Sequence, residues 1–372
     1  MRGRSRWPAV IFAFVVGLTA GGLAGAALLI GPGGYRPQNT VAIHSASPSP
    51  SPSPTSVPAA RPAGRTGAAM AFDAGSGKIV LFGGYVSRGT YHEFGDPIGD
   101  TWTWDGAHWT QVQASNSPAP RYGATMTNDA AHRNIVLHGG LLANQGAVND
   151  TWTWSGGRWL QMSPNASPPS YGGPQPMCWN TQSSAVILYS YLGQTITPGS
   201  VPTIGQMWTW DGANWTQLSP AQMPSGFEYQ PATLACDTAR KSVVLFGHAT
   251  SGPSNSVGTP VTWTFDGNTW TQVSSPGSAS LTFLMAPDDA RSTLVLFGEN
   301  GDTWTWDGAR WNVQNPVHSP PARVRASMAY DATHRVVVLF GGSTGTAAAL
   351  HELNDTWTWN GSDWTQVLAD SP

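Results

Sequence analysis

The most regular pattern in the chain alternates threonine with tryptophan, passes through a turn, and resumes with another tryptophan. In its first copy, DTWTWDGAHWTQV (Asp100–Val112), Trp102 and Trp104 are two residues apart, so a strand would place both on one face. The Asp-Gly pair that follows is a strong signal for a tight hairpin turn. This stretch therefore predicts two antiparallel strands, Thr101–Trp104 and Trp109–Val112.

Five further copies of the stretch follow along the chain. The first tryptophans of the six copies are 41 to 56 residues apart: Trp102, Trp152, Trp208, Trp263, Trp304 and Trp357. A repeat of about 50 residues with four strands in each unit is typical of β-propellers. The repeat therefore predicts an array of six similar units rather than several unrelated domains.

Each unit also has two predicted strands before the tryptophan hairpin, and we name the four strands A to D in chain order. In the first unit, strands A and B are predicted at Gly67–Phe72 and Ile79–Phe82. A constant step of ten residues runs from the A–B turn to the end of strand B in every unit: Asp73 to Gly83, Asp129 to Gly139, Asn180 to Ser190, Asp237 to Gly247, Asp288 to Gly298 and Asp331 to Gly341. Small residues in strand A and tryptophans in strands C and D suit blades that crowd at an axis and diverge outward.

The predicted fold is therefore all-β, a six-bladed propeller of four-stranded antiparallel blades over residues 65–372. The predicted blades are about 65–120, 121–168, 169–224, 225–276, 277–320 and 321–369. Strand D of the sixth unit is the last predicted strand. We therefore expect blade six to close the ring by packing its face on blade one, with no shared sheet.

The residues before the first blade predict an anchor and a stalk. Pro8–Ile30 contains no charge, follows three arginines, and is long enough to cross a bilayer as a helix. Residues 1–34 are therefore predicted as a signal anchor, with a signal peptide cleaved near Ala24-Gly25-Ala26 as the alternative. Residues 35–64 are Pro/Ser-rich and predict an extended stalk. The propeller is expected outside the cytoplasm, membrane-anchored or, after cleavage, secreted.

Composition and motifs exclude several classes of function. Charged residues are only 10% of the chain and the net charge is −3, so there is no electrostatic case for nucleic-acid binding. Two cysteines are too few for a disulfide scaffold or a cysteine-based zinc site. Nucleophile elbows, phosphate-binding loops and metal-binding helix motifs do not occur in the sequence. We expect a monomer without cofactor or metal.

Three features carry a resemblance to a known family. They are the glycine pairs after strand B (Gly83-Gly84, Gly139-Gly140 and Gly341-Gly342), the pair Trp104-Asp105, and the following Trp109. From about residue 65 to the end, the chain resembles Kelch-repeat proteins and the central domain of galactose oxidase. Units three, four and five lack the glycine pair, and tryptophan replaces the usual tyrosine before the C–D turn.

The resemblance to galactose oxidase does not predict its copper-radical chemistry. That chemistry requires two histidines, two tyrosines and a cysteine joined to one of the tyrosines. The histidines of this chain are scattered (His92, His138, His248 and His351), and neither cysteine lies in a matching constellation.

One face of the predicted propeller is a candidate binding face. In a four-stranded meander the B–C loops and D–A connections emerge together, and the B–C loops are long in every unit except the fifth. Strand A of units one, two and six is preceded by Arg65, Arg121 and Arg323. We predict that this arc binds carboxylates of an acidic sugar or peptide. The alternative is that each arginine pairs with a nearby loop acid or backbone carbonyl.

Two further candidate ligand residues lie in each of two B–C loops. The loops of units one and six contain YHEFGD and LHELND, and unit six closes onto unit one. His92, Glu93, His351 and Glu352 are therefore predicted to lie near one another at a ligand site. Such residues could hold a divalent metal, but adjacent side chains point apart in a strand, and solvated loop residues are the favoured account.

Cys178 and Cys236 are predicted on strand A of the neighbouring units three and four. They are one position out of phase, which is the parity that two strands need to face each other. An exported protein would permit their oxidation, so we predict a cross-blade disulfide. Two buried free thiols are the alternative.

Together these features predict an extracytoplasmic binding module whose B–C and D–A loops recognise a protein or a cell-wall glycan. The alternative, implied by the family resemblance, is a sugar-directed enzyme such as a Kelch-type epimerase. It would use Arg65, Arg121, Arg323 and Glu93. No catalytic residue is assigned, and catalysis is the less favoured hypothesis.

Overall fold

The computed structural model describes residues 61–86, 95–143, 146–170, 175–190, 205–224, 232–249, 258–275, 277, 282–346 and 349–371. These described residues contain no helix that is long and apolar enough to cross a membrane. The predicted anchor at residues 1–34 and most of the predicted stalk lie outside the described residues.

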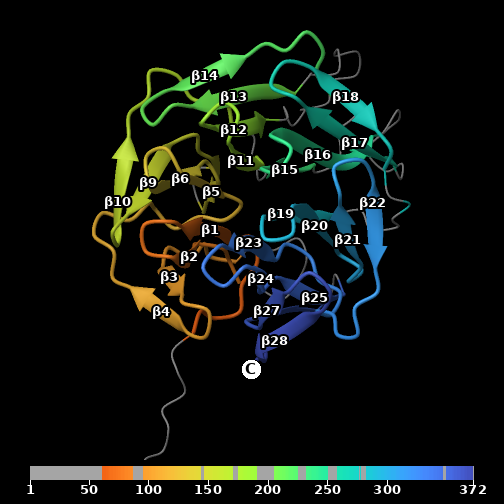
Figure 1. Ribbon diagram of the computed structural model, residues 1–372. Helices are drawn as coiled ribbons and strands as arrows, with labels where there is room; N and C mark the ends of the chain where they lie inside the picture. The colour runs from red at the N-terminus through yellow and green to blue at the C-terminus, as the bar shows by residue number, and fades with distance from the viewer. Residues whose placement is uncertain are drawn as a thin grey trace, which may run out of the picture. The chain divides into compact units, whose positions relative to one another are not determined.

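Six four-stranded antiparallel sheets surround a common axis, with strand A of each blade innermost (Figure 1). Blade one contains β1 (Ala69–Asp73), β2 (Lys78–Phe82), β3 (Thr101–Trp104) and β4 (Trp109–Val112). Blade two contains β5 (Thr125–Asp129), β6 (Asn134–His138), β9 (Thr151–Ser155) and β10 (Arg158–Met162). Blade three contains β11 (Met177–Asn180), β12 (Ala185–Ser190), β13 (Gln206–Trp210) and β14 (Trp215–Leu218).

The second half of the ring repeats this order. Blade four contains β15 (Thr233–Asp237), β16 (Ser242–Ala249), β17 (Thr259–Phe265) and β18 (Trp270–Val273). Blade five contains β19 (Phe283–Asp288), β20 (Thr293–Gly298), β21 (Thr303–Trp306) and β22 (Trp311–Gln314). Blade six contains β23 (Ser327–Asp331), β24 (Val336–Phe340), β27 (Thr356–Trp359) and β28 (Trp364–Leu368). The six predicted four-stranded units are confirmed.

Two short hairpins interrupt the otherwise regular order. They are β7 (Leu141–Leu142) with β8 (Gly146–Ala147), and β25 (Ser343–Thr346) with β26 (Ala349–Glu352). Both lie in B–C loops, of blades two and six respectively. The sequence pattern of the repeats did not predict them.

Strand B is a continuous apolar run because it is covered on both faces. In blade one, Val80 and Phe82 pack toward blade two, while Ile79 and Leu81 pack toward blade six. All four side chains are at most 1% exposed. Alternate residues of one strand thus fill the two gaps beside its blade, which explains why period-two patterning is absent here.

A ring of hydrogen bonds joins the blades through their tryptophans. The tryptophan of strand D donates its indole N–H to a threonine of strand C in the preceding blade. The Nε1 to Oγ1 distances are 2.9–3.0 Å for Trp109 to Thr356, Trp159 to Thr101, Trp215 to Thr151, Trp311 to Thr262, and Trp364 to Thr303. In blade four, Trp270 faces the Sδ atom of Met207 instead, at 3.0 Å.

The first and last blades close the ring without sharing a sheet, as expected from the sequence. Strand β28 completes the sixth sheet, and β1 to β4 form the first. Across the seam, Trp109 bonds Thr356, and the Ser327 hydroxyl donates to the Ala68 carbonyl at 2.7 Å. Closure therefore depends on side-chain packing and individual hydrogen bonds.

Removing one bond of the tryptophan ring should destabilise the propeller. Thr303→Val keeps the shape of the side chain but leaves the buried Nε1 of Trp364 without an acceptor. A buried donor without a partner costs about 1–3 kcal/mol. Thr103→Val is the matched control, because the Thr103 hydroxyl makes only a 3.5 Å contact to the Thr110 carbonyl. Urea unfolding should show the loss in T303V alone; equal stability of the two variants would contradict the role of the ring.

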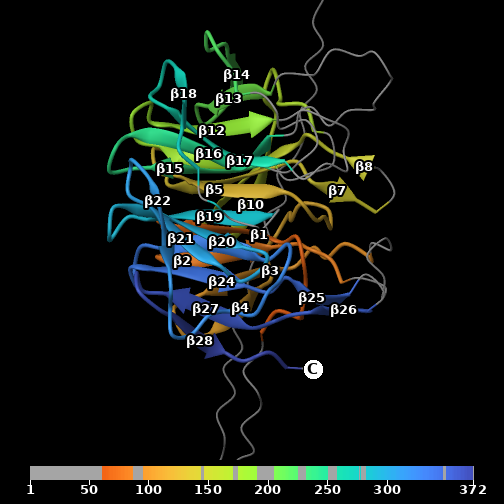
Figure 2. The same cartoon turned by 90° about the vertical axis from the view of Figure 1, so that its right-hand side faces the viewer.

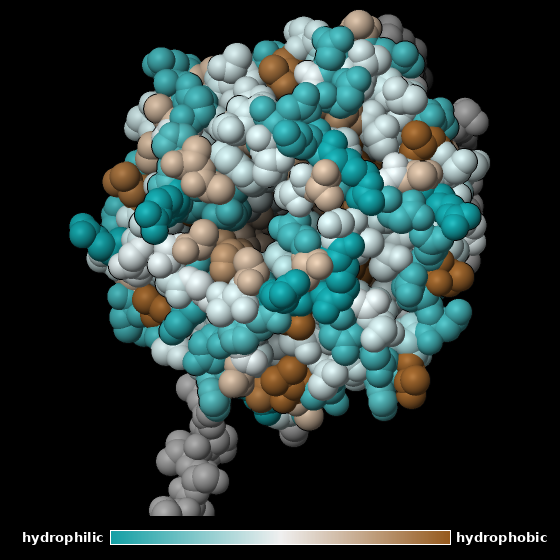
Figure 3. All heavy atoms as spheres, in the orientation of Figure 1, coloured by the Kyte–Doolittle hydropathy of each residue, from teal (hydrophilic) through white to brown (hydrophobic). Residues whose placement is uncertain are grey.

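The A–B and C–D turns form the face seen in Figure 3, which is hollowed at the axis. In five seams, a side chain of the A–B turn covers the glycine of the next blade's C–D turn. A Cβ atom added at Gly106 would lie 2.4 Å from the ring of His334. The equivalent pairs are Gly212 with His132, Gly267 with Gln182, Gly308 with Arg240, and Gly361 with Arg291. This face therefore consists of short turns held against one another.

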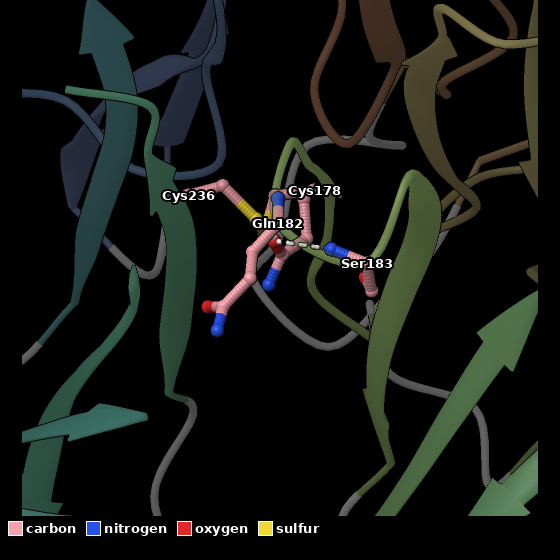
Figure 4. Close-up of a disulfide and its surroundings, with 5 residues drawn as sticks. Cys178, Gln182, Ser183 and Cys236 are labelled. Atoms are coloured by element: carbon pink, nitrogen blue, oxygen red, sulfur yellow. Dashed lines mark hydrogen bonds between the residues drawn. A yellow bond between two sulfur atoms is a disulfide. The ribbon is translucent and has the colours of Figure 1, made fainter. Parts of the chain in front are cut away.

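A disulfide joins blades three and four. Cys178 on β11 and Cys236 on β15 are bonded, with their Cα atoms 5.5 Å apart (Figure 4). These are the two cysteines of the chain. The bond lies between the blades whose tryptophan contact uses Met207 in place of threonine. A covalent link thus holds the seam that lacks the regular bond.

Candidate functional site on the loop face

The described parts of the B–C loops and D–A connections lie on one face of the propeller, at the right in Figure 2. The hairpins β7–β8 and β25–β26 lie on the same side (Figure 2). We call this side the loop face. Loops on a rigid β-scaffold commonly carry binding residues, so the loop face is the candidate functional surface.

The three predicted arginines lie on the loop face, each bound to an aspartate of its own blade. Arg323 donates from Nη1 and Nη2 to the two carboxylate oxygens of Asp355 at 2.7 and 2.9 Å. It also donates to the carbonyl oxygens of Gly341 and Pro321, both at 3.0 Å. Trp357 donates its indole N–H to the same aspartate at 2.7 Å. We call this arrangement the arginine clamp.

The clamp recurs in blades one and two. Arg65 binds both carboxylate oxygens of Asp100, and Arg121 binds those of Asp150. Burial alone would raise the pKa of Asp100, but the hydrogen bonds and charge of Arg65 outweigh burial and hold the pKa below its usual value. The side chains of the three arginines are at most 1% exposed. Ligand binding by these arginines stays a prediction, and their geometry favours a structural role inside each blade.

His351 is held by the C-terminal residues of blade six. Its Nε2 atom lies 2.6 Å from a carboxylate oxygen of Asp370, and the other oxygen accepts the backbone N–H of Asn354 at 2.8 Å. His92 and Glu93 lie outside the described residues, so their predicted proximity to His351 and Glu352 stays a prediction. Within the described ranges, no group of three or more His, Cys, Asp or Glu residues is placed to hold a metal.

A cluster of two tyrosines and an arginine lies where strand A of blades six, one and two begins. Gly67, Gly123 and Arg325 occupy equivalent positions, and their φ angles are 63°, 65° and 56°. Their backbones are linked around the axis, because Gly67 N–H bonds the Arg325 carbonyl and Gly123 N–H bonds the Gly67 carbonyl. A left-handed backbone conformation is uncommon for any residue other than glycine, which makes Arg325 a candidate functional residue.

The Arg325 side chain is exposed and donates to the hydroxyl of Tyr85. The ring of Tyr85 packs edge-to-face on Tyr122, with centroids 4.7 Å apart. Burial, followed by the neighbouring Tyr85, raises the pKa of Tyr122 above its usual value. We name Arg325, Tyr85 and Tyr122 the axial cluster. Sequence reasoning missed it, although an arginine aligned with Gly67 and Gly123 was a readable signal.

Blades four and five lack a glycine that blades one, two and six have on the loop face. In blades one, two and six, the second residue after strand B is a glycine with positive φ: Gly84, Gly140 and Gly342. The equivalent residues of blades four and five are His248 and Glu299. The loss of the second glycine was visible in the sequence, but His248 was counted there only among scattered histidines.

His138 belongs to the core rather than to the loop face. It ends strand B where four other blades have phenylalanine and blade three has Tyr189. Its ring packs edge-to-face on Trp215 with centroids 5.4 Å apart. Its Nδ1 atom lies 3.2 Å from the hydroxyl of Thr151. Burial lowers the pKa of His138 to about 4, against the opposing charge of Asp150.

His138 should make the propeller sensitive to acid. As the pH falls below about 6.5, the unfolded chain takes up a proton that the folded chain does not bind until about pH 4. Stability is therefore lost as the pH falls through this window, by roughly 3 kcal/mol at pH 4. His138→Phe introduces the residue that blades one, four, five and six have at this position and should flatten this slope. Urea midpoints of both proteins between pH 7 and 4.5 test this; parallel slopes would contradict the assignment.

No protein-family model matches the chain, and no curated protein matches it in sequence. Among solved structures, YjhT superposes with a TM-score of 0.54 at 15% identity, covering 82% of this chain and 98% of that one. The SapL1 lectin in complex with alpha methyl fucoside superposes with a TM-score of 0.51 at 14% identity, covering 83% and 97%. At these identities the likeness concerns the fold alone: the chain is a six-bladed β-propeller with tryptophan-rich repeats.

Proposed function

We propose that this protein is an exported binding module that recognises a carbohydrate chain through its loop face. The observation that carries this proposal is the axial cluster. An exposed arginine is held in a left-handed conformation beside two tyrosines, at the point where three blades meet the axis. Residues other than glycine that hold this conformation occur mainly in turns, ligand clamps and active sites.

Two further observations support the proposal. The disulfide between Cys178 and Cys236 suits an oxidising compartment outside the cytoplasm. One structural neighbour of the same fold is a lectin in complex with a fucoside. Together they favour a glycan over a protein as the ligand, and an extracytoplasmic location.

The repeat type and the N-terminal segments predicted from the sequence form part of the same proposal. We propose that the repeats are of the Kelch type and that residues 1–34 anchor the propeller to a membrane, with the proline-rich segment as a stalk. Sequencing the N-terminus of the exported protein distinguishes a retained anchor from cleavage near Ala26. The epimerase alternative has less support, because Arg65, Arg121 and Arg323 are bound to aspartates; its fourth residue, Glu93, lies outside the described residues.

The test is binding of the purified full-length protein to an array of cell-surface glycans, together with Arg325→Gly. Glycine is the residue found at this position in blades one and two, so the variant removes the side chain without straining the backbone. We expect wild type to bind and R325G to bind at least about tenfold more weakly, the cost of one charge-assisted hydrogen bond. Failure of wild type to bind any glycan would overturn the proposal.

A further inference from the structure

We propose that the loop face over blades four and five holds a separate ligand subsite, formed by His248, Phe283 and Glu299, which takes an uncharged, hydroxyl-bearing group such as one ring of a neutral saccharide. The proposal rests on the proposed function, the loop face being the binding surface. It differs in position from the axial cluster and in ligand charge from the predicted arginine arc.

The repeat pattern of the other blades is broken at this place. A Cβ atom added at Gly84 would lie 2.9 Å from the Thr66 carbonyl oxygen, and one at Gly342 would lie 2.8 Å from the Val324 carbonyl oxygen. Three blades therefore leave no room for a side chain here. Blades four and five instead present an imidazole and a carboxylate, and β16 continues through His248 to Ala249, paired with β17.

His248 has a buried ring nitrogen without a hydrogen-bond partner. The residue is 2% exposed, and its Nδ1 atom is buried without a hydrogen-bond partner. Its ring stacks on Phe283 with centroids 5.8 Å apart and planes 15° apart, so the orientation of the imidazole is fixed. A buried polar atom without a partner costs about 1–3 kcal/mol. A ligand hydroxyl would supply the missing partner.

Glu299 is held in place by hydrogen bonds of its side chain and backbone. One of its carboxylate oxygens accepts the Thr282 hydroxyl at 2.7 Å, and its backbone N–H bonds the Thr282 carbonyl at 3.1 Å. Its own carbonyl accepts the N–H of Arg323 at 2.9 Å. The strand B to strand C connection that follows Gly298 is short, since β21 begins at Thr303. Glu299 is thus a rigidly placed acceptor beside the shortest loop of the face.

These groups define the chemistry of the ligand. Burial lowers the pKa of His248, although the charge of Glu299 opposes this, so the imidazole is neutral at physiological pH. A neutral imidazole and a carboxylate accept hydrogen bonds from hydroxyl groups, and the partly exposed Phe283 offers an apolar contact for ring C–H groups. The carboxylate would repel an acidic sugar. The subsite therefore favours a neutral saccharide.

The experiment compares wild type with Glu299→Gln and His248→Phe on an array of neutral oligosaccharides and their uronic-acid counterparts. Glu299→Gln keeps an oxygen for Thr282, and His248→Phe keeps the aromatic stack, so both variants are designed to fold. Arg158→Gln, at an exposed C–D turn on the opposite face, is the control. We expect wild type and R158Q to bind a neutral glycan equally, and each subsite variant to bind at least about tenfold more weakly.

The outcomes separate this inference from the proposed function. If wild type binds a glycan and the folded E299Q and H248F variants bind it equally well, the subsite is wrong and the binding module stands. If wild type binds only the uronic acids, the assigned ligand class is wrong. If wild type binds nothing on the array, both the subsite and the proposed function are overturned.

Discussion

Replacing Asp355 with asparagine should lower the free energy of unfolding by about 3–5 kcal/mol, the cost of leaving a buried charge without its partner. Arg323 and Asp355 form the most buried of the three clamps, with side chains 0% and 3% exposed. Asparagine keeps an oxygen for the indole N–H of Trp357. The variant thus removes the charge that faces the guanidinium group while the shape of the site is retained. Urea or thermal unfolding measures the effect.

The double variant Arg323→Met/Asp355→Asn distinguishes the loss of the whole ion pair from the loss of one charge alone. Removing both charges leaves no uncompensated ion, so the double variant should be more stable than D355N alone. If D355N unfolds within about 1 kcal/mol of wild type, the clamp does not hold blade six as described, and Arg323 would regain its predicted place as a ligand residue.

Loss of the disulfide should cost about 4 kcal/mol in the chain-entropy account, because the bonded residues are 58 positions apart. The loss of stability should be large at this seam, because Trp270 contacts Met207 here rather than a threonine hydroxyl. Cys178→Ala/Cys236→Ala is the variant, and its urea midpoint is compared with that of the oxidised wild type.

Reduction supplies the control for this measurement. Dithiothreitol should lower the midpoint of wild type to near that of the double alanine variant and leave the variant unchanged. Equal midpoints for oxidised and reduced wild type would show that the cross-blade bond contributes nothing to stability. The fold alone would then hold blades three and four together.

The ring consists of two different halves. Blades six, one and two share the arginine clamp, the glycine pair and the left-handed strand start. Blades three and four have Gly172 and Tyr229 in the sequence where the clamp has its arginine, and they are joined by the disulfide. Blades four and five carry His248 and Glu299. Positions shared by several blades serve stability, whereas the departure at His248 leaves a buried nitrogen without a partner, as is expected at a functional site.

Most of the fold could be predicted because it depends on local and repeated patterns. The predicted strands Thr101–Trp104 and Trp109–Val112 match β3 and β4, and predicted strand B differs from β2 by one residue. Alternation and turn residues act over a few positions, and six copies of them average out local exceptions. The hairpins β7–β8 and β25–β26 were not predicted, because their sequences are not part of the six-fold repeat.

The candidate site was less predictable, because it depends on which side chains become buried together. Arg323 was recognised as a shared position, but its partner Asp355 is 32 residues away, and only the folded blade brings their charged groups together without water. The Nδ1 atom of His248 likewise lacks a partner only in the folded structure, where the imidazole is buried and stacks on Phe283 of the next blade. The sequence by itself determined the number of blades, their strands and the face on which the loops gather. The tertiary structure decided which charges are satisfied within the blades and which polar atoms remain for a ligand, since burial and pairing between blades are set by contacts between distant residues.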